Sequence, residues 1–357
     1  MTRPQLLIDT DPGVDDALAI LMAHAHADVA GLSIAAGNVG LGHTVRNART
    51  LVDLLGVATP IFAGCATPLV RAPDEDAAFV HGQDGFGDVG FPAPRAALTD
   101  EAAALALLRL TRERPGQLTL VALAPLTNLA LALRIDPSLP ERVARLVIMG
   151  GAVTGHGNTG NVPAEFNIGF DPEAAHVVFE AFPQFELVDW EATLRHAFDD
   201  AEFEGWLKQG DERAGFYDSI AGTARAYNAQ HGRRGVIAAD ALAMAVAIDP
   251  SIVTRSEKRA VFYDGIAGTA RAYNAKHGRR GVIAADALAM AVAIDPSIVT
   301  RRETRAVAVE LDGRLTRGAT VVDWAQRLGQ PTNADIVLEV DQARFAAMVR
   351  RALGAET

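Results

Sequence analysis

The chain has 357 residues, 49% of them hydrophobic and 22% charged, which is typical of a folded globular protein. Its net charge is −11, and an acidic surface argues against binding to nucleic acid. Its one cysteine, Cys65, excludes an internal disulfide. The first residues lack the pattern of a signal peptide, and no apolar stretch is long enough to span a membrane. We therefore expect a cytoplasmic protein that does not associate with a membrane, and its length suits either one large domain or two ordinary ones.

Apolar segments of two kinds alternate along the first half of the chain. The strand-like runs are residues 6–8, 29–36, 118–123, 146–149 and 185–188. The helix-like patterns are residues 17–25, 44–55, 126–134 and 172–182. Alternating strands and helices indicate an α/β protein, and strands this uniformly apolar are covered on both faces. The sequence therefore predicts a mainly parallel central sheet flanked by helices, in a Rossmann-like arrangement.

An internal repeat occupies residues 216–261 (copy one) and 262–307 (copy two). The two copies differ only at Ser219/Gly265, Gln230/Lys276, Ser256/Arg302 and Lys258/Thr304. Two copies are too few for a solenoid, so we interpret the repeat as a tandem duplication. A compact fold has room for one copy. The other is expected to be looped out, packed outside or swapped with a neighbouring chain, and its removal leaves 357 − 46 = 311 residues.

Four aspartates lie within the segment DTDPGVDDA: Asp9, Asp11, Asp15 and Asp16. They follow the first predicted strand, and ligands of α/β sheets collect at the carboxyl ends of strands. Carboxylates this close repel one another unless a cation neutralises them. Hard cations such as Ca²⁺ and Mg²⁺ prefer oxygen ligands. The segment therefore predicts a cation site.

Three other interpretations would account for some of these aspartates. Asp15 as a helix cap, with the others flanking a turn, explains one or two acids but not four. An EF-hand is disfavoured because the twelfth position from Asp9 is Ile20 rather than glutamate. A Mg²⁺-dependent phosphohydrolase with Asp9 as nucleophile stays open, although Pro12 follows the second aspartate.

The segment LLIDTDPGVDDALAI resembles the N-terminal signature of the nucleoside hydrolase family, the inosine-uridine preferring type among others. Further motifs match the family in order: AGN at 36–38, AGCATPLV at 63–70, HGQDGFGDV at 81–89, ALAPLTNLA at 122–130, VIMGGA at 147–152, AEFNIGFDPEAAHVVF at 164–179 and DALAMAVAIDP at 240–250. This resemblance covers nearly the whole chain, and the one-copy length suits the family. It implies Ca²⁺-dependent hydrolysis of the N-glycosidic bond of ribonucleosides, by a homo-oligomer (dimer or tetramer).

The resemblance also implies roles for individual residues. The Ca²⁺ ligands would be Asp11, Asp15, Asp16, the carbonyl of Leu123, and an aspartate of the DALAMA helix, either Asp240 or Asp286. Asp11 matches the general base and Asp9 a supporting residue. The ribose contacts would be Asn38, Glu165, Asn167 and one of Asn158 and Asn161, with Asn158 preferred. On the base side the matches are His81, Tyr227 and its duplicate Tyr273.

Two features depart from the family pattern. Ala239 and Ala285 stand where inosine-uridine and pyrimidine-handling members have a histidine, the acid that protonates the departing base. This absence favours purine nucleosides, with His81, His231 or His277 as alternative proton donors. The repeat supplies two candidates for one ligand position, and we expect only one of them to bind the cation. A non-catalytic ribose or calcium binder is the remaining alternative.

Overall fold

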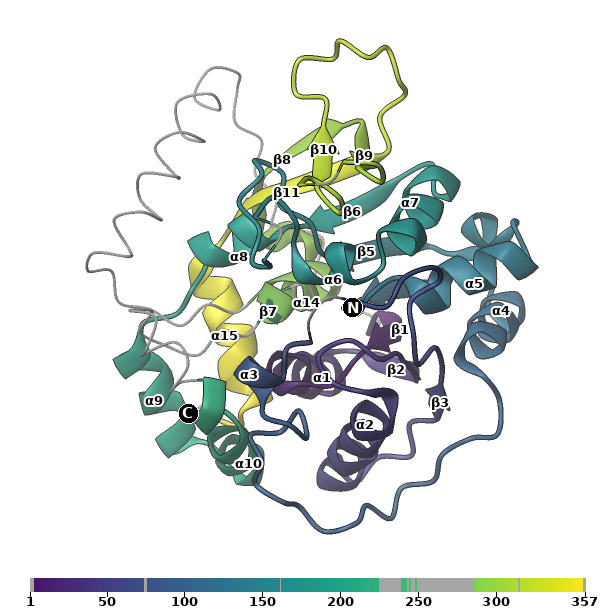
Figure 1. The fold of residues 1–357 in the computed structure, drawn as a ribbon. Coiled ribbons are helices and arrows are strands. Elements are labelled where there is room, and N and C mark those ends of the chain that lie inside the picture. The colour runs from purple at the N-terminus through teal and green to yellow at the C-terminus, as the bar shows by residue number, and fades with distance from the viewer. Residues whose placement is uncertain are drawn as a thin grey trace.

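The computed structural model describes residues 3–73, 76–160, 162–224, 239–242, 244, 248, 285–313 and 315–355. Its centre is an eight-stranded sheet with the order β3-β2-β1-β4-β5-β6-β11-β8 (Figure 1). The strands are β1 Gln5–Thr10, β2 Asp28–Ile34, β3 Ile61–Ala63, β4 Leu118–Ala122, β5 Arg145–Met149, β6 Phe185–Val188, β8 Val299–Arg305 and β11 Ala334–Val340. A separate pair, β9 Val307–Val309 and β10 Thr320–Val322, is antiparallel.

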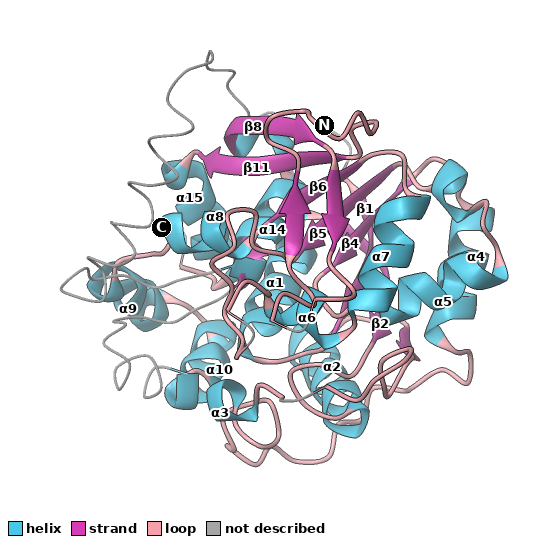
Figure 2. Cartoon of the chain, turned by 45° about the horizontal axis from the view of Figure 1, so that its top comes forward, coloured by secondary structure: helices cyan, strands magenta, loops and turns pink. Residues whose placement is uncertain are grey.

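The central sheet is parallel except at one edge, where β8 pairs antiparallel with β11. Side chains of β1 alternate between two buried clusters, Leu6 and Ile8 in one and Leu7 in the other. Helices cover both faces (Figure 2). The first cluster includes α1 Val14–His26, α2 Leu41–Leu55, α14 Ala285–Ile294 and α15 Gln342–Ala352. The second includes α4 Ala103–Glu113, α5 Thr127–Ile135 and α7 Pro172–Ala181. The predicted fold class is confirmed.

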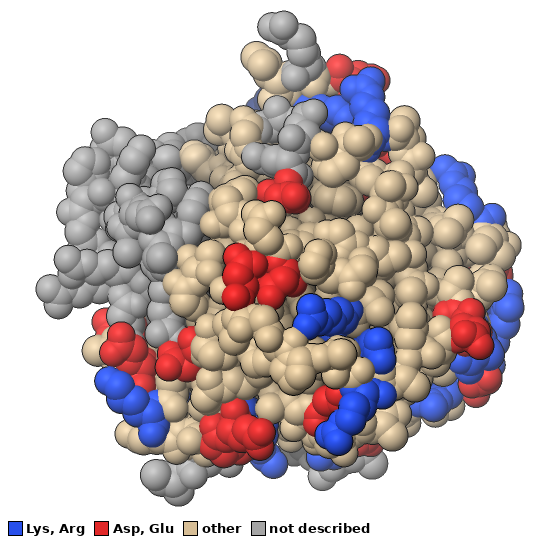
Figure 3. Space-filling view, turned by 60° about the horizontal axis from the view of Figure 1, so that its bottom comes forward, with Lys and Arg blue, Asp and Glu red and all other residues tan. Residues whose placement is uncertain are grey.

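The remaining helices are short or lie at the periphery. They are α3 Ala78–His81, α6 Phe166–Phe170, α8 Trp190–Arg195, α9 Asp200–Gln209 and α10 Glu212–Ile220, with 3₁₀ turns at Leu139–Arg142 and Pro296–Ile298. In the part of the chain that the structure describes, no helix is long and apolar enough to cross a membrane. On the face seen in Figure 3, acidic and basic side chains lie in small separate groups.

β1 and β4 are parallel neighbours, and the order in which successive strands are added to the sheet changes direction between them. The chain leaves β1 in one direction, toward β2 and β3, and the later strands add on the other side. In a doubly wound sheet the crevice at such a switch point is where ligands bind. The DTDPGVDDA segment begins with the last two residues of β1 and continues into α1 at this switch point, so the fold places it where ligands are expected.

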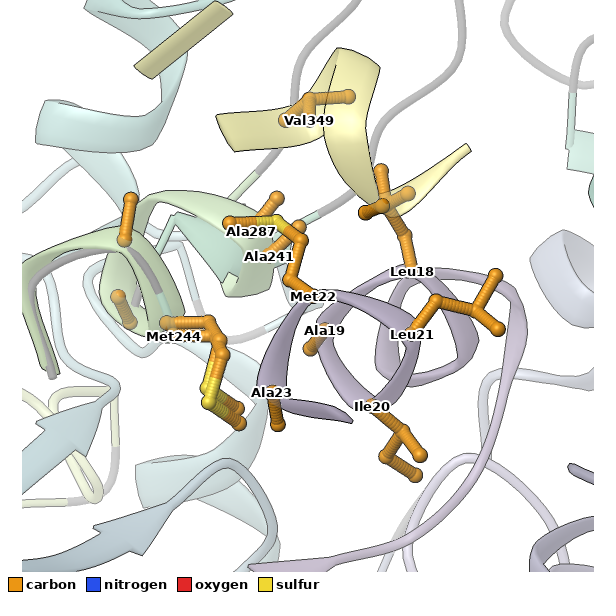
Figure 4. Close-up of a cluster of buried hydrophobic side chains, with 14 of the residues drawn as sticks. Leu18, Ala19, Ile20, Leu21, Met22, Ala23, Ala241, Met244, Ala287 and Val349 are labelled. Carbon is orange, nitrogen blue, oxygen red and sulfur yellow. The ribbon is translucent and has the colours of Figure 1, made fainter. Parts of the chain in front are cut away.

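The described residues of the repeat draw on both copies. From copy one, the buried Phe216, Tyr217 and Ile220 of α10 join the first core cluster. From copy two come the whole of α14 and the whole of β8. Ala241 and Met244 of copy one also lie in that cluster, beside α1 and α14 (Figure 4). The core thus contains residues from the beginning and the middle of copy one and from the end of copy two.

The structure corrects one local expectation. The DALAMA segment is helical in copy two, but in copy one Ala239–Leu242 is the strand-like β7, so the helix expected at Asp240 is wrong. Since α14 already packs on α1 and β5, that position is filled. After α14, β8 pairs with β11 up to Arg305, and β9 then pairs with β10.

Candidate active site

The candidate site begins where β1 and β4 end side by side. Asp9 lies opposite Ala122 in the sheet, and the next residue, Leu123, donates its N–H to the Asp9 carbonyl at 2.8 Å. From there the chain turns through Pro12 and Gly13 into α1, which carries Asp15 and Asp16 in its first turn. Acidic side chains are favoured there because a helix N-terminus carries partial positive charge. The turn thus brings the aspartates together at the switch point.

Asp16 is held by four hydrogen-bond donors. One carboxylate oxygen accepts from the Thr10 hydroxyl and from the Asp11 N–H at 3.2 Å. The other accepts the Gly13 N–H and the Asn38 Nδ2, both at 2.9 Å. Burial, with the charge of Asp15, raises the pKa of Asp16 to about 7 despite these bonds. The orientation of this carboxylate is therefore fixed before any ligand binds.

Asp11 is 1% exposed, and only one of its carboxylate oxygens is engaged. Oδ2 accepts the Asn38 N–H at 2.7 Å, while Oδ1 is buried without a hydrogen-bond partner among the described residues. Burial, and next the charge of Asp16, raises the pKa of Asp11 well above its usual range. A buried, unpartnered carboxylate oxygen is costly, so this atom points to a bound cation or a substrate proton.

Asp9 lies behind the cluster in a polar network that the sequence did not reveal. Its Oδ1 accepts from the Ser33 hydroxyl and from Asn128 Nδ2, and Asn128 also accepts the Cys65 N–H at 2.8 Å. Burial raises the pKa of Asp9 to about 7. Asn128 and Cys65 lie in matched motifs, but nothing in their spacing indicates that they meet. The network ties β1 and β2 to the start of α5.

The donor set fits a cation. Asp15, Asp16, Asp240 and Asp286 are all buried, and each offers a carboxylate oxygen within 4.8 Å of the others. Among the described residues, both oxygens of Asp240 and Oδ1 of Asp286 have no hydrogen-bond partner. Burial, then the charge of Asp15, raises the pKa of Asp286 well above its usual range. Asp11 is not within that distance of all four, although its charge also acts on Asp286.

His81 lies against the cluster. The imidazole is 5% exposed, its Nδ1 accepts the Val14 N–H at 3.1 Å, and the same atom is 3.7 Å from Asp15 Oδ1. If Nδ1 accepts, the ring proton is on Nε2. The sequence placed His81 near a nucleobase, and the structure brings it to the start of α1.

The polar residues of the AEFN motif lie on the other side, around α6. Glu165 is 1% exposed and caps α6, accepting the N–H groups of Gly151 at 2.9 Å, Asn167 at 3.0 Å and Ile168 at 3.2 Å. Burial raises the pKa of Glu165 to about 7. Asn167 donates Nδ2 to the Leu123 carbonyl at 2.7 Å. The motif therefore contacts the backbone atom predicted to bind the cation.

The remaining residues predicted to contact the substrate lie at the edge of the aspartate cluster, on the surface, or outside the described residues. Asn158 is exposed, and its Oδ1 accepts the Phe166 N–H at 2.8 Å. Asn38 uses its amide to hold the Asp11 carbonyl at 3.1 Å and Asp16. Outside the described residues lie Asn161, Tyr227, His231, Tyr273 and His277.

A doubly wound α/β sheet with buried acids at its switch point is the architecture of an enzyme that binds its ligand at the carboxyl ends of the strands. The profile of the family described as inosine-uridine preferring nucleoside hydrolase matches residues 6–265 and 255–347. The chain belongs to this family and is a nucleoside hydrolase. The two matched ranges overlap only slightly and do not by themselves establish a duplication.

Named relatives agree with this membership. The chain is 31% identical over 357 residues to an inosine-uridine preferring nucleoside hydrolase of Leishmania major, covering 98% of this chain and 97% of the relative. It is 36% identical over 257 residues to uridine nucleosidase 1 of Arabidopsis thaliana, covering 70% and 75%. Among solved structures, an inosine-guanosine nucleoside hydrolase superposes with a TM-score of 0.80 at 29% identity, covering 100% of both chains.

Proposed function

We propose that the chain hydrolyses ribonucleosides to free base and ribose with Ca²⁺ held by Asp11, Asp15, Asp16, the Leu123 carbonyl and one of Asp240 and Asp286. The observation that supports this proposal most directly is the set of buried carboxylate oxygens at the switch point. Several of these oxygens have no hydrogen-bond partner among the described residues. Charges buried so close together are strongly destabilising unless a cation or protons neutralise them. Oxygen-only ligation suits a hard cation such as Ca²⁺.

Asp11 is the proposed general base. The Asn38 N–H fixes Oδ2 at 2.7 Å, and this leaves Oδ1 to take a proton from the attacking water. When bound, the cation supplies Lewis acidity that orients a sugar diol and lowers the pKa of a water molecule. Asn38 and the Thr10 hydroxyl hold Asp11 and Asp16 in place, so little reorganisation accompanies the proton transfer.

Asn38, Glu165, Asn167 and Asn158 are the proposed ribose contacts. The oxygens of Glu165 keep lone pairs beyond the backbone N–H groups that they accept, so they remain able to accept a ribose hydroxyl. Breaking the N-glycosidic bond builds positive charge on the sugar ring, and a nearby carboxylate favours that charge. Oriented binding of the ribose adds to the rate because the reacting atoms are held together.

The proposed preference is for purine nucleosides. Ala239 and Ala285 replace the histidine that would protonate a pyrimidine leaving group. A structural neighbour is named for inosine and guanosine, whereas the Arabidopsis relative is named for uridine. His81 remains a proposed contact on the base side, with its Nε2 proton directed away from Val14.

We further propose a single catalytic domain over residues 1–357, a cytoplasmic location and a homo-oligomer. The repeat is proposed to be a tandem duplication with one copy extra. Its support is the near-identity of 216–261 and 262–307, together with the mixed origin of the core.

The test is release of reducing sugar from inosine, guanosine, adenosine, uridine and cytidine, with and without a calcium chelator. The expected result is ribose release, faster for the purines, that stops with chelator and returns with Ca²⁺. Full release of ribose in the presence of chelator would show that the reaction does not need the cation. Equal rates for all five nucleosides would remove the purine preference.

A further inference from the structure

The loop between β5 and α6, residues 150–165, carries the predicted ribose contacts Asn158 and Glu165. Its two ends meet, because Gly151 donates its N–H to Glu165 at 2.9 Å. Within the loop, Asn158 donates its N–H to the Ala164 carbonyl and accepts the Phe166 N–H at 2.8 Å. The position of Asn158 is therefore set by the path of the loop.

One side of this loop is attached to the start of α8, which follows the neighbouring strand β6 (Figure 2). Gly150 donates its N–H to the Val188 carbonyl at 3.1 Å, and Trp190 donates to the Gly151 carbonyl at 2.9 Å. The next contact comes from Asp189, whose carboxylate accepts the Val153 N–H at 3.1 Å. These bonds fix the first residues of the loop.

Glu191 continues the attachment along the loop. Its carboxylate accepts the Thr154 N–H at 2.9 Å, the Thr154 hydroxyl at 2.6 Å and the His156 N–H at 3.1 Å. The residue is 7% exposed, while Thr154 and His156 are exposed. The imidazole of His156 is 3.4 Å from the same carboxylate. The buried carboxylate of Glu191 thus holds an exposed part of the loop. The last residue that it contacts, His156, is two residues before Asn158 in the chain.

We propose that Glu191 is a positioning residue for substrate binding: it fixes the β5–α6 loop so that Asn158 is presented to the ribose. The proposal rests on the proposed function in assigning Asn158 to the sugar. A buried carboxylate that accepts several N–H and O–H donors is costly to remove, since each donor loses its partner. Loss of these bonds frees the loop and lowers the affinity for the sugar.

The test is a double-mutant cycle between Glu191→Ala and Asn158→Ala. We expect each single variant to raise KM for inosine about tenfold, with a smaller change in kcat, as expected for loss of one or two hydrogen bonds to substrate. If Glu191 acts through Asn158, the double variant has the KM of Asn158→Ala alone. Glu191→Gln keeps one accepting oxygen and is expected to restore part of the affinity.

Glu186→Ala is the matched control, because Glu186 is a poorly exposed carboxylate of the preceding strand that pairs with Arg145 at 2.7 Å instead of with the loop. Its KM is expected to equal that of the parent even if its Tm falls. The cycle is repeated on the equilibrium affinity for free ribose, which needs no turnover. Absence of ribose release by the parent then contradicts the proposed function, while the coupling is still measured.

Three results would overturn the positioning role. The first is that the effects of the two substitutions multiply, both in KM and in the affinity for ribose. The second is an unchanged KM in Glu191→Ala with only a lower Tm, and the third is an Asn158→Ala variant that binds ribose like the parent.

Discussion

At the scale of single residues, the carboxylates of the site differ in how many hydrogen bonds they accept. Asp16 has four donors, whereas Asp11 Oδ1 and both oxygens of Asp240 have no hydrogen-bond partner among the described residues. A carboxylate fixed on all sides orients its neighbours, and one with an open oxygen is available to a cation or a proton. This difference supports the proposed roles of Asp16 as a fixed ligand and of Asp11 as the general base.

Asp240 and Asp286 offer a direct comparison, since both lie in the cluster. Asp286 belongs to the formed helix α14, and Asp240 to the strand-like β7. We expect Asp286→Asn to lower calcium-supported hydrolysis by at least about 100-fold, because loss of a residue that only supports a metal ligand already lowers affinity or activity by about 10–100-fold. Asp240→Asn is expected to keep the parent rate within about twofold. Equal losses in both variants would contradict a single working copy.

The buried acids also make the stability of the calcium-free protein depend on pH. Burial raises the pKa of Asp16 from 3.8 to about 7, so the folded chain binds more protons than the unfolded chain between these values. Stability therefore falls as pH rises from about 4 to about 7. We expect Tm of the chelated protein to be lower at pH 8 than at pH 5.5 by roughly 5 °C or more.

Addition of Ca²⁺ is expected to reverse this trend, because the ion binds the ionised carboxylates and stabilises the folded state at higher pH. Thermal melts at both pH values, with and without Ca²⁺, measure the difference. A Tm that rises with pH in the chelated protein would show that these carboxylates are already neutralised.

At the scale of the elements, the turn after β2 shows how close the backbone comes to the site. A Cβ on Gly37 would lie 2.0 Å from Asp11 Oδ2 and 2.9 Å from Pro125 Cδ. Only glycine fits such an approach without displacing the carboxylate. We expect Gly37→Ala to lower kcat/KM by roughly 100-fold, as a small misplacement of a catalytic group does.

Gly42→Ala is the matched variant, because a Cβ at Gly42, near the start of α2, meets nothing within 4 Å. It is expected to keep the parent activity and to raise stability by about 0.5–1 kcal/mol, since alanine favours a helix. Steady-state kinetics and thermal melts of both variants test the pair. Equal activity of Gly37→Ala and the parent would mean that Asp11 tolerates displacement.

The elements were predictable where local pattern and burial agree. The strands β1, β2, β4, β5 and β6 and the helices α1, α2, α5 and α7 follow from apolar runs bounded by turn residues, whereas α4 and β3 were not among the predicted elements. The pairing of β8 with β11 was not predictable, because it depends on residues far apart in the chain. The contact of Ser33 and Asn128 with Asp9 likewise depends on the tertiary fold.

In the candidate site, the motif predicted the aspartate cluster but not its internal bonds. Asp11, Asp15 and Asp16 follow one strand, so local sequence is enough to place them. Glu191 carries no motif, and its bonds to Thr154 and His156 arise only because β5 and β6 are neighbours in the sheet. The helix wrongly expected at Asp240 shows the same limit, since two identical segments compete for one place.

At the scale of the whole molecule, the core contains residues of both copies: the end of α10, Ala241 and Met244 come from copy one, and α14 comes from copy two. Deletion of residues 225–270 joins Ala224 to Arg271 and leaves 357 − 46 = 311 residues with one complete copy. The retained α10 and α14 already pack in the first core cluster. We expect this variant to fold, with a Tm at least equal to that of the parent and full calcium-supported hydrolysis.

Thermal melts, size-exclusion chromatography and the reducing-sugar assay compare the deletion variant with the full chain. A control deletion of the same length, residues 166–211, removes α6 to α9 and is expected to prevent folding. An unfolded 225–270 deletion variant would mean that both copies are needed.

The measurement that tests the central claim most directly is a calcium titration of the chelated protein, with bound calcium and ribose release followed in the same samples. The account predicts that hydrolysis rises in proportion to bound calcium and saturates at one ion per chain, and that Asp11→Asn releases no ribose at any calcium concentration. Full ribose release before calcium binds, or calcium binding that leaves the rate unchanged, would contradict it.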